Sequence, residues 1–187
     1  PEQFSKRKTA VLACLDATDY AQFEAFDARI DEFSVYAAAP YLSANRISHM
    51  FNLEGPSETF NVACASVYMA VDKAAKLISD GIVEQVVVVS AQLNLLPSRF
   101  EMLAQRQLLT PTSIVAPFDQ NATGFLRSEG VGCLILKSSA SAIEDTDNIL
   151  VHVQGSAAWH GGRGDSLTTP NSLTHLRVIE SAFRKSG

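Results

Sequence analysis

The chain has 187 residues, of which 47% are hydrophobic and 19% are charged, and its net charge at pH 7 is −5. This composition excludes a disordered chain, and the acidic balance argues against a nucleic-acid or membrane-surface partner, since both favour basic proteins. Cys14, Cys64 and Cys133 show neither disulfide nor zinc spacing. Because no signal peptide and no membrane-spanning apolar run is present, we expect a cytoplasmic protein.

The predicted elements alternate between strands and helices. The near-continuous apolar run from Thr9 to Leu15 predicts a strand buried on both faces, with Cys14 in the core. The β-branched run within 82–91 predicts a central strand. Helices are expected at 41–51, 99–109 and 172–185, and a loosely helical segment at 20–41. Further strands are expected at 133–137, with Cys133 in the core, and at 149–154, and the segment 138–148 between them is expected to be a polar surface connection.

The most informative stretch runs from Glu58 to Val71. A short strand at Thr59–Val62 passes through small residues around Cys64 into a helix that reaches about Asp80, and a further strand follows. This order predicts a βαβ unit with a parallel strand pair and a right-handed crossover. The first turn of a helix favours a thiolate, which makes Cys64 a candidate nucleophile; the alternative is a structural cysteine.

The histidines provide no evident partner for this thiol. His49 is a candidate base, but for His49 and for His152 a structural role fits better. His160 lies between the only tryptophan and a Gly-Gly pair, in the loop 155–171. Because such a pair favours unusual backbone angles or a close approach, His160 is the histidine best placed to line a pocket.

Several blocks, in order, resemble the β-ketoacyl synthase family, in particular the ketosynthase domains of modular polyketide synthases. Val62-Ala63-Cys64-Ala65-Ser66 stands where the family has its acyl-accepting cysteine, usually in the sequence TACSS. Asn45-Arg46-Ile47-Ser48 with Gly55-Pro56-Ser57 is similar to the helix and turn that precede it. Leu109-Thr110-Pro111 through Pro117-Phe118-Asp119 is similar to "LSPDGRCKPFD".

Two further blocks extend the resemblance over nearly the whole chain. The segment 122–132 is similar to the family's "ADGYVRGEGAG", and 155–171 is similar to its "GSAVNQDGRSNGLTAPN". Within the second block, His160-Gly161-Gly162 is closer to the variant of trans-acyltransferase polyketide synthases.

The resemblance implies an α/β, thiolase-like fold with α-β-α-β-α layers, incomplete in this chain. Residues 1–187 are then a partial ketosynthase domain, mostly its N-terminal half, and 155–187 begin the C-terminal half. It also implies an acyltransferase with Cys64 as the catalytic residue, whose backbone N–H is the first oxyanion donor, and with His160 lining the substrate pocket. No tightly bound cofactor is expected.

The implied substrates are an acyl-carrier-protein phosphopantetheine thioester or a coenzyme A thioester, followed by a malonyl-carrier thioester for decarboxylative condensation. The implied partners are a second copy of the chain, which pairs through the strand before Cys64, an acyl carrier protein and other polyketide synthase domains.

Some family features differ here or lie elsewhere. The two histidine motifs that drive decarboxylation follow the position of Gly187 in the family, and Asn61-Val62 and Ala65 replace the common Asp-Thr and Ser. The alternative is a non-condensing relative that binds or gates acyl groups or scaffolds a dimer. A cysteine hydrolase is a more remote alternative, because no histidine has a recognisable pairing context.

Overall fold

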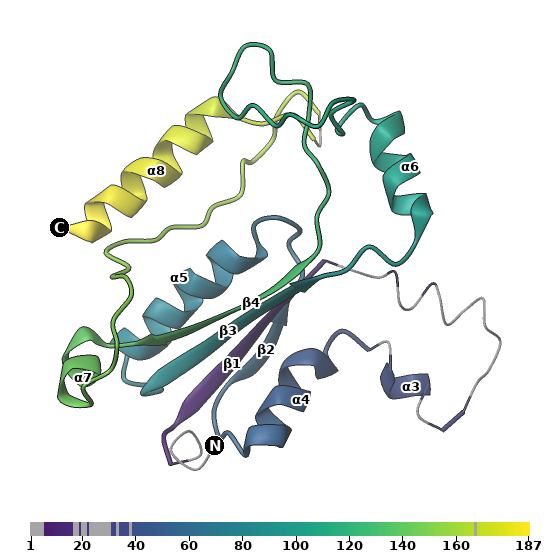
Figure 1. Ribbon diagram of the computed structural model, residues 1–187. Helices are drawn as coiled ribbons and strands as arrows, with labels where there is room; N and C mark the ends of the chain where they lie inside the picture. The colour runs from purple at the N-terminus through teal and green to yellow at the C-terminus, as the bar shows by residue number, and fades with distance from the viewer. Residues whose placement is uncertain are drawn as a thin grey trace.

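A computed structural model describes residues 6–16, 19, 22, 31–32, 34–37, 39–166 and 168–187. Its centre is a four-stranded sheet in the order β2-β1-β3-β4 (Figure 1). The strands are β1 (Thr9–Leu15), β2 (Ser57–Phe60), β3 (Gln85–Gln92) and β4 (Gly130–Lys137). Strand β1 pairs in parallel with both β2 and β3, whereas β4 is antiparallel to β3. The carboxyl ends of the three parallel strands therefore meet at one edge of the sheet.

One helix covers each face of the central strands. Because successive side chains of a strand point to opposite faces, Leu12 and Val88 pack on one side and Val11 and Val87 on the other. Helix α5 (Ser66–Ser79) covers the first face, and α4 (Leu42–Phe51) covers the second (Figure 1). This double cover explains why β1 is apolar almost without interruption, as a strand buried on both faces must be.

The remaining helices surround this core. They are α3 (Ser34–Ala37), α6 (Pro97–Gln105), α7 (Ser139–Glu144) and α8 (Ser172–Ser186). Helix α6 lies beyond the carboxyl end of β3, and α8 lies apart from the sheet, beyond α5 (Figure 1). The predicted helices at 41–51 and 172–185 are confirmed within a residue at each end, and the helix predicted at 99–109 begins and ends earlier, as α6. The loosely helical segment predicted at 20–41 lies largely outside the described residues.

The prediction that the strands on either side of α5 pair with each other was wrong in one respect. Strands β2 and β3 do run in the same direction, but β1 lies between them. The most apolar strand takes the central position because that position buries both of its faces. The order of strands along the chain does not carry this information.

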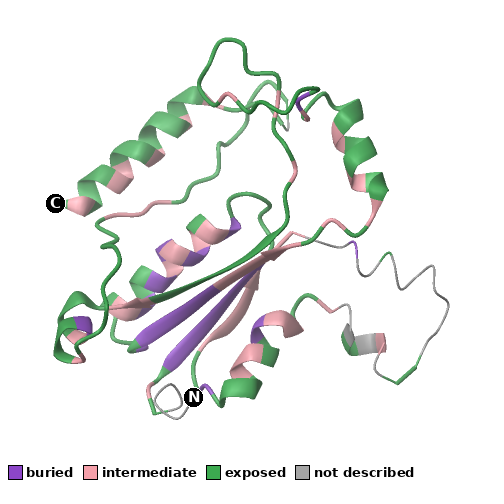
Figure 2. Cartoon of the chain, viewed as in Figure 1, coloured by how far each residue is buried: buried purple, intermediate pink, exposed green. Residues whose placement is uncertain are grey.

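The interpretation of Cys133 as a core residue was also wrong, because Cys133 is exposed on β4. Strand β4 is an edge strand, and the buried residues of the sheet concentrate in β1 and β3 (Figure 2). Residues 149–154, predicted as a strand, form no ladder, and the connection 138–148 contains the short helix α7, capped by the Ser138 side chain. Cys14 is buried, as predicted.

In the part of the chain that the structure describes, no helix combines the length and the apolar character that a membrane span requires.

Candidate active site

Cys64 lies in the tight turn that joins β2 to α5, and its side chain is exposed. The strand ends at Phe60, and α5 begins at Ser66 after Ala65, whose backbone is already helical (φ −84°, ψ −7°). Two backbone hydrogen bonds close the turn: Ala65 N–H donates to Val62 O at 3.1 Å, and Ser66 N–H donates to Ala63 O at 3.1 Å. The cysteine is thus at the carboxyl edge of the sheet and at the start of a helix, as predicted.

The residue before the cysteine has a strained backbone. Ala63 has φ of +47°, in the left-handed region. A residue with a Cβ loses about 1–2 kcal/mol in this region, because its Cβ crowds the carbonyl oxygen. Such a conformation persists only where surrounding contacts hold it, and it is typical of functional sites.

Ser66 provides those contacts. Its hydroxyl accepts a hydrogen bond from Val62 N–H at 2.8 Å and donates one to Ala63 O at 2.8 Å. The side chain is buried, with 4% of the residue exposed, so solvent does not compete for these bonds. The hydroxyl therefore serves once as an acceptor and once as a donor, in both cases for backbone groups next to Cys64.

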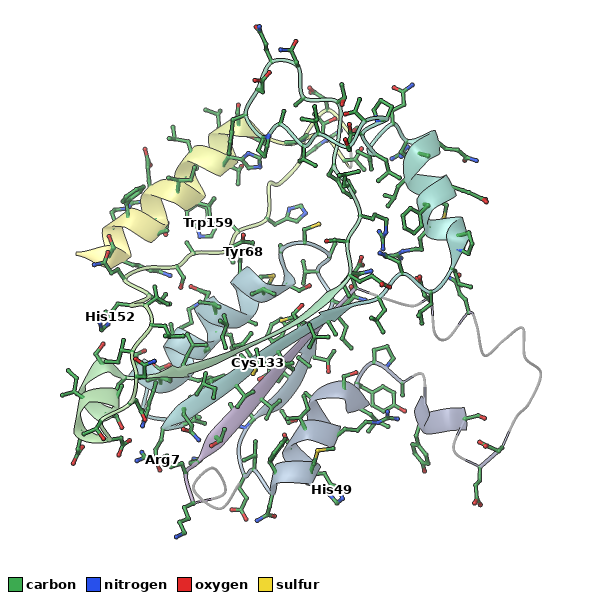
Figure 3. The ribbon with its side chains drawn as sticks, viewed as in Figure 1. Arg7, His49, Tyr68, Cys133, His152 and Trp159 are labelled. Atoms are coloured by element: carbon green, nitrogen blue, oxygen red, sulfur yellow. The ribbon has the colours of Figure 1, made fainter. Side chains whose placement is uncertain are left out.

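The histidines lie at different places. His49 is in the last turn of α4, and Figure 3 shows it at the opposite end of the sheet from Tyr68, which is in the first turns of α5, near Cys64. His152 is exposed, and its Nδ1 is 3.3 Å from the Ser139 hydroxyl of α7. Both side chains are exposed, so neither is packed in the core, and the structural roles expected for both stay predictions.

His160 lies in an exposed loop beside its glycines. Its Nδ1 accepts a hydrogen bond from Gly162 N–H at 2.9 Å, and Gly162 has φ of +70°, so the Gly-Gly pair does provide the unusual backbone angle. His160 lines a surface hollow of about 550 Å³ together with residues 161–164, 166, 168–171 and His175. Cys64 is not among the lining residues, and the role of His160 in an acyl pocket stays a prediction.

A buried carboxylate connects the loop of His160 to α5. Asp72 of α5 accepts hydrogen bonds from Lys76 at 2.5 Å, from the Ser156 hydroxyl at 2.9 Å and from Lys185 of α8 at 3.2 Å. Lys185 also donates to Ser156 O at 2.7 Å. Burial by itself would raise the pKa of Asp72, but the three donors outweigh it and hold this pKa below its ordinary value. The start of the loop is therefore held on the helix that follows Cys64.

Two of the blocks that resemble the family's motifs are joined through Thr110. Its buried hydroxyl is 2.8 Å from that of Thr123 and 3.1 Å from that of Thr112. Beside it, Phe125 N–H donates to Leu108 O at 3.0 Å, and Thr110 N–H donates to Phe125 O at 3.1 Å. The segments around 110 and 124 thus form one unit.

A polar cluster lies just beyond the carboxyl end of β3. Asn94 accepts a hydrogen bond from Arg127 Nε at 2.8 Å, and its N–H donates to Glu129 at 2.6 Å. The Arg127 guanidinium lies over the Phe100 ring, 5.6 Å from its centroid, which connects α6 to this cluster. These contacts fix the loops at the same edge of the sheet as Cys64.

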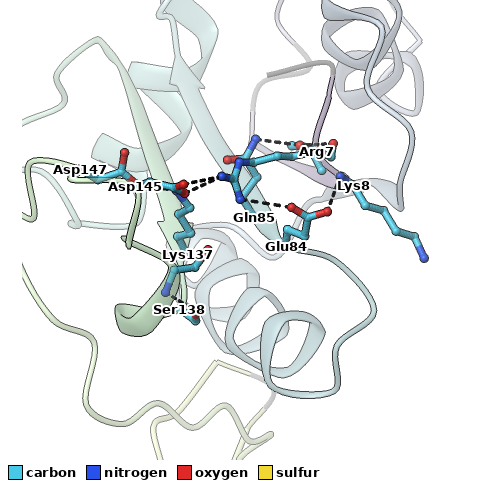
Figure 4. A network of polar contacts seen from close by, with 10 residues as sticks. Arg7, Lys8, Glu84, Gln85, Lys137, Ser138, Asp145 and Asp147 are labelled. Atoms are coloured by element: carbon cyan, nitrogen blue, oxygen red, sulfur yellow. Dashed lines mark hydrogen bonds and ion pairs between the residues drawn. The ribbon is translucent and has the colours of Figure 1, made fainter. Parts of the chain in front are cut away.

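The opposite edge of the sheet carries an ionic network (Figure 4). Arg7 Nη2 donates to the two carboxylate oxygens of Asp145 at 2.7 and 2.6 Å, and Arg7 Nη1 donates to Glu84 at 3.2 Å. Lys137 also contacts Asp145, and its hydrogen bond is the main reason why the pKa of Asp145 is below its ordinary value. This network connects the amino ends of β1 and β3 to α7 and has a structural role.

Among the residues that the structure describes, no group of three His, Cys, Asp or Glu side chains is arranged to hold a metal ion.

Comparisons with solved structures define the class of the fold. The Streptomyces albus oxazolomycin ketosynthase domain OzmH KS7 matches with a TM-score of 0.89 and 27% identity, over 100% of this chain and 33% of that chain. The ketosynthase from module 6 of the Bacillus subtilis bacillaene synthase, at 23% identity, matches in fold with a TM-score of 0.83, over 97% of this chain and 30% of that chain. The fold is the thiolase-like α/β fold of ketosynthases, as predicted.

Sequence comparisons specify the family. Residues 1–142 match the family model "Beta-ketoacyl synthase, N-terminal domain", and the chain therefore belongs to the β-ketoacyl synthase family. It is 36% identical over 180 residues to polyketide synthase ThaG of Burkholderia thailandensis, over 96% of this chain. It is 41% identical over 148 residues to polyketide synthase PksR of Bacillus subtilis, over 79% of this chain. The chain spans only 3% and 6% of these two relatives.

Two residues with a part in the site were not identified from sequence. In the sequence Ser66 is one of the small residues of the turn, and nothing singles out Asp72 within its helix. A serine at the first position of a helix, directly after a tight turn, is a detectable signal for a side chain that bonds the local backbone. For Asp72, whose partners come from residues 156 and 185, no local signal exists.

Proposed function

We propose that the chain accepts an acyl group on the sulfur of Cys64 and transfers it to carbon in a decarboxylative condensation. The observation that carries this proposal is the position of Cys64, exposed in a strained turn at the start of α5, within the part of the chain that matches the family model. Helix α5 is apolar on its sheet side and packs against the buried sheet, so the turn has a rigid support.

In the first step the Cys64 thiolate attacks the carbonyl carbon of an acyl thioester carried by an acyl carrier protein or coenzyme A. A carbon–sulfur bond forms, and the carbonyl oxygen becomes an oxyanion. The oxyanion collapses, the bond to the carrier sulfur breaks, and the carrier leaves as a thiolate that takes up a proton. Covalent catalysis of this kind divides a difficult transfer into two easier ones.

In the second step a malonyl-carrier thioester loses CO₂, and the electron pair of the broken carbon–carbon bond becomes an enolate. The enolate carbon attacks the acyl carbon on Cys64. A new carbon–carbon bond forms, the bond to sulfur breaks, and Cys64 is released as the thiolate. The product is a β-ketoacyl thioester, two carbons longer, on the carrier.

We also infer that the chain acts as a homodimer together with a carrier protein and other polyketide synthase domains. Strand β2, which precedes Cys64, is at the edge of the sheet, where a second copy of the same strand could add to it. Sedimentation velocity tests this inference: a monomer at micromolar concentration would contradict it.

The acyl transfer is tested by intact-mass analysis after incubation with a short acyl thioester of N-acetylcysteamine. We expect one acyl group on the parent protein and on Cys133→Ala, which removes the other exposed thiol, and none on Cys64→Ala. Acylation of Cys64→Ala to the parent level would refute the assignment. Addition of malonyl-carrier protein then tests condensation: acylation of Cys64 without release of CO₂ or extension of the acyl chain would contradict condensation by these 187 residues.

A further inference from the structure

The peptide unit between Ala63 and Cys64 is held by two hydrogen bonds, and both come from Ser66. Ala63 O accepts one from Ser66 N–H at 3.1 Å and one from the Ser66 hydroxyl at 2.8 Å. The carbonyl of Ala63 and the N–H of Cys64 belong to the same planar trans peptide, in which the two groups point in opposite directions. A contact that fixes the direction of the carbonyl therefore also fixes the direction of the N–H.

The hydroxyl of Ser66 also holds the preceding part of the turn. It accepts from Val62 N–H at 2.8 Å, so one oxygen bridges the backbone on both sides of Ala63. Ala63 is the strained residue, with φ of +47°. Relief of this strain requires a change of φ at Ala63, and with the Val62–Ala63 peptide in place such a change would also turn the Ala63–Cys64 peptide and its N–H. The buried hydroxyl opposes it.

We propose that Ser66 is a positioning residue that aims the backbone N–H of Cys64 at the oxyanion formed during acyl transfer. The inference rests on the proposed function, in which Cys64 is the acyl acceptor. Ser66 itself touches neither the substrate nor the reacting atoms; it acts through the Ala63–Cys64 peptide. An oxyanion donor is effective only when its direction is fixed before the charge develops.

The chemistry offers a test that separates positioning from support of the fold. Acylation by a thioester passes through an oxyanion, whereas alkylation by iodoacetamide displaces iodide in one step and forms none. Both reactions use the same Cys64 thiolate. The ratio of the two rates therefore reports on the oxyanion donor and is independent of changes in the amount of thiolate.

The matched variants are Ser66→Thr and Ser66→Val, which have nearly the same shape and differ in the hydroxyl. We expect Ser66→Val to acylate about 10- to 100-fold more slowly than Ser66→Thr, and the two to be alkylated at rates within about twofold, because only acylation needs the aimed donor. Rates are followed at Cys64 by peptide mass spectrometry in the full chain. Ser66→Ala, which removes the hydroxyl without adding a methyl group, serves as the second variant because the site is buried, and it should resemble Ser66→Val.

Three results would overturn the inference. Equal acylation of Ser66→Thr and Ser66→Val would show that the hydroxyl is not required. A parallel fall in acylation and alkylation would show a general loosening of the turn. A parent protein that is alkylated at Cys64 but not acylated would refute the proposed function, and the role of Ser66 with it; this result differs from the first two, because there the parent is acylated.

Discussion

A substitution of Gly124 tests quantitatively how closely the segments around residues 110 and 124 pack against each other. Its φ is +133°, a backbone conformation that residues with a side chain rarely adopt. A Cβ added there would lie 2.5 Å from Leu108 O and 2.7 Å from both Leu109 C and Thr110 N. All three are backbone atoms in a bonded pair of segments, so they cannot move aside as a flexible side chain would.

The magnitude follows from these two effects. The unfavourable backbone angle costs about 1–3 kcal/mol, and the overlap costs about 1–3 kcal/mol more. Gly124→Ala should therefore lower the free energy of unfolding by about 2–6 kcal/mol, which corresponds to a fall in Tm of about 4–24 °C for a chain of this size.

The assay is thermal unfolding followed by circular dichroism, with Gly130→Ala as the matched control. At Gly130 an added Cβ meets nothing within 4 Å, and this glycine is at the start of the exposed strand β4. We expect the control to change Tm by less than about 3 °C. Equal Tm values for the two variants would refute the argument that the backbone of residues 108–110 excludes a side chain at position 124.

Two further predictions concern Asp72 and the cysteines. The pKa of Asp72 is lowered in the folded protein, so its contribution to stability is complete above the ordinary carboxyl pKa of about 4 and is lost as the pH falls through the lower, folded value. Asp72→Asn should thus lower the free energy of urea unfolding by about 1.5–3 kcal/mol at neutral pH. The loss should shrink as the pH falls from about 4, where the unfolded carboxyl gains a proton, through the lower folded value, where the folded parent gains one too. The exposed Asp80→Asn is the control, and a loss for Asp72→Asn that does not depend on pH would contradict this account. Iodoacetamide should modify the exposed Cys64 and Cys133 and spare Cys14, because Cys14 is only 1% exposed and burial raises the pKa of its thiol. Peptide mass spectrometry measures this, and labelling of Cys14 at the rate of Cys133 in the folded protein would show that β1 is not buried.

Much of the fold could be predicted because the deciding signals are local. The apolar run of β1, the valines of β3 and the periodicity of α4, α5 and α8 follow from the burial of strand faces and helix stripes, which neighbouring residues specify. The place of Cys64 between a strand and a helix is local in the same sense. The functional interpretation of Cys64 needed more, namely several blocks in the order found in one family.

The sequence by itself determined the main strands and helices, the family and the position of the candidate nucleophile. Only the tertiary structure decided that β1 separates β2 from β3, that β4 with Cys133 lies at an exposed edge, and that Asp72 holds the loop of His160. These features depend on contacts between residues far apart in the chain, which no local pattern encodes. For Ser66 both sources were needed. Its place at the start of the helix can be seen in the sequence, but the direction of its hydroxyl toward the Ala63–Cys64 peptide is a property of the folded turn.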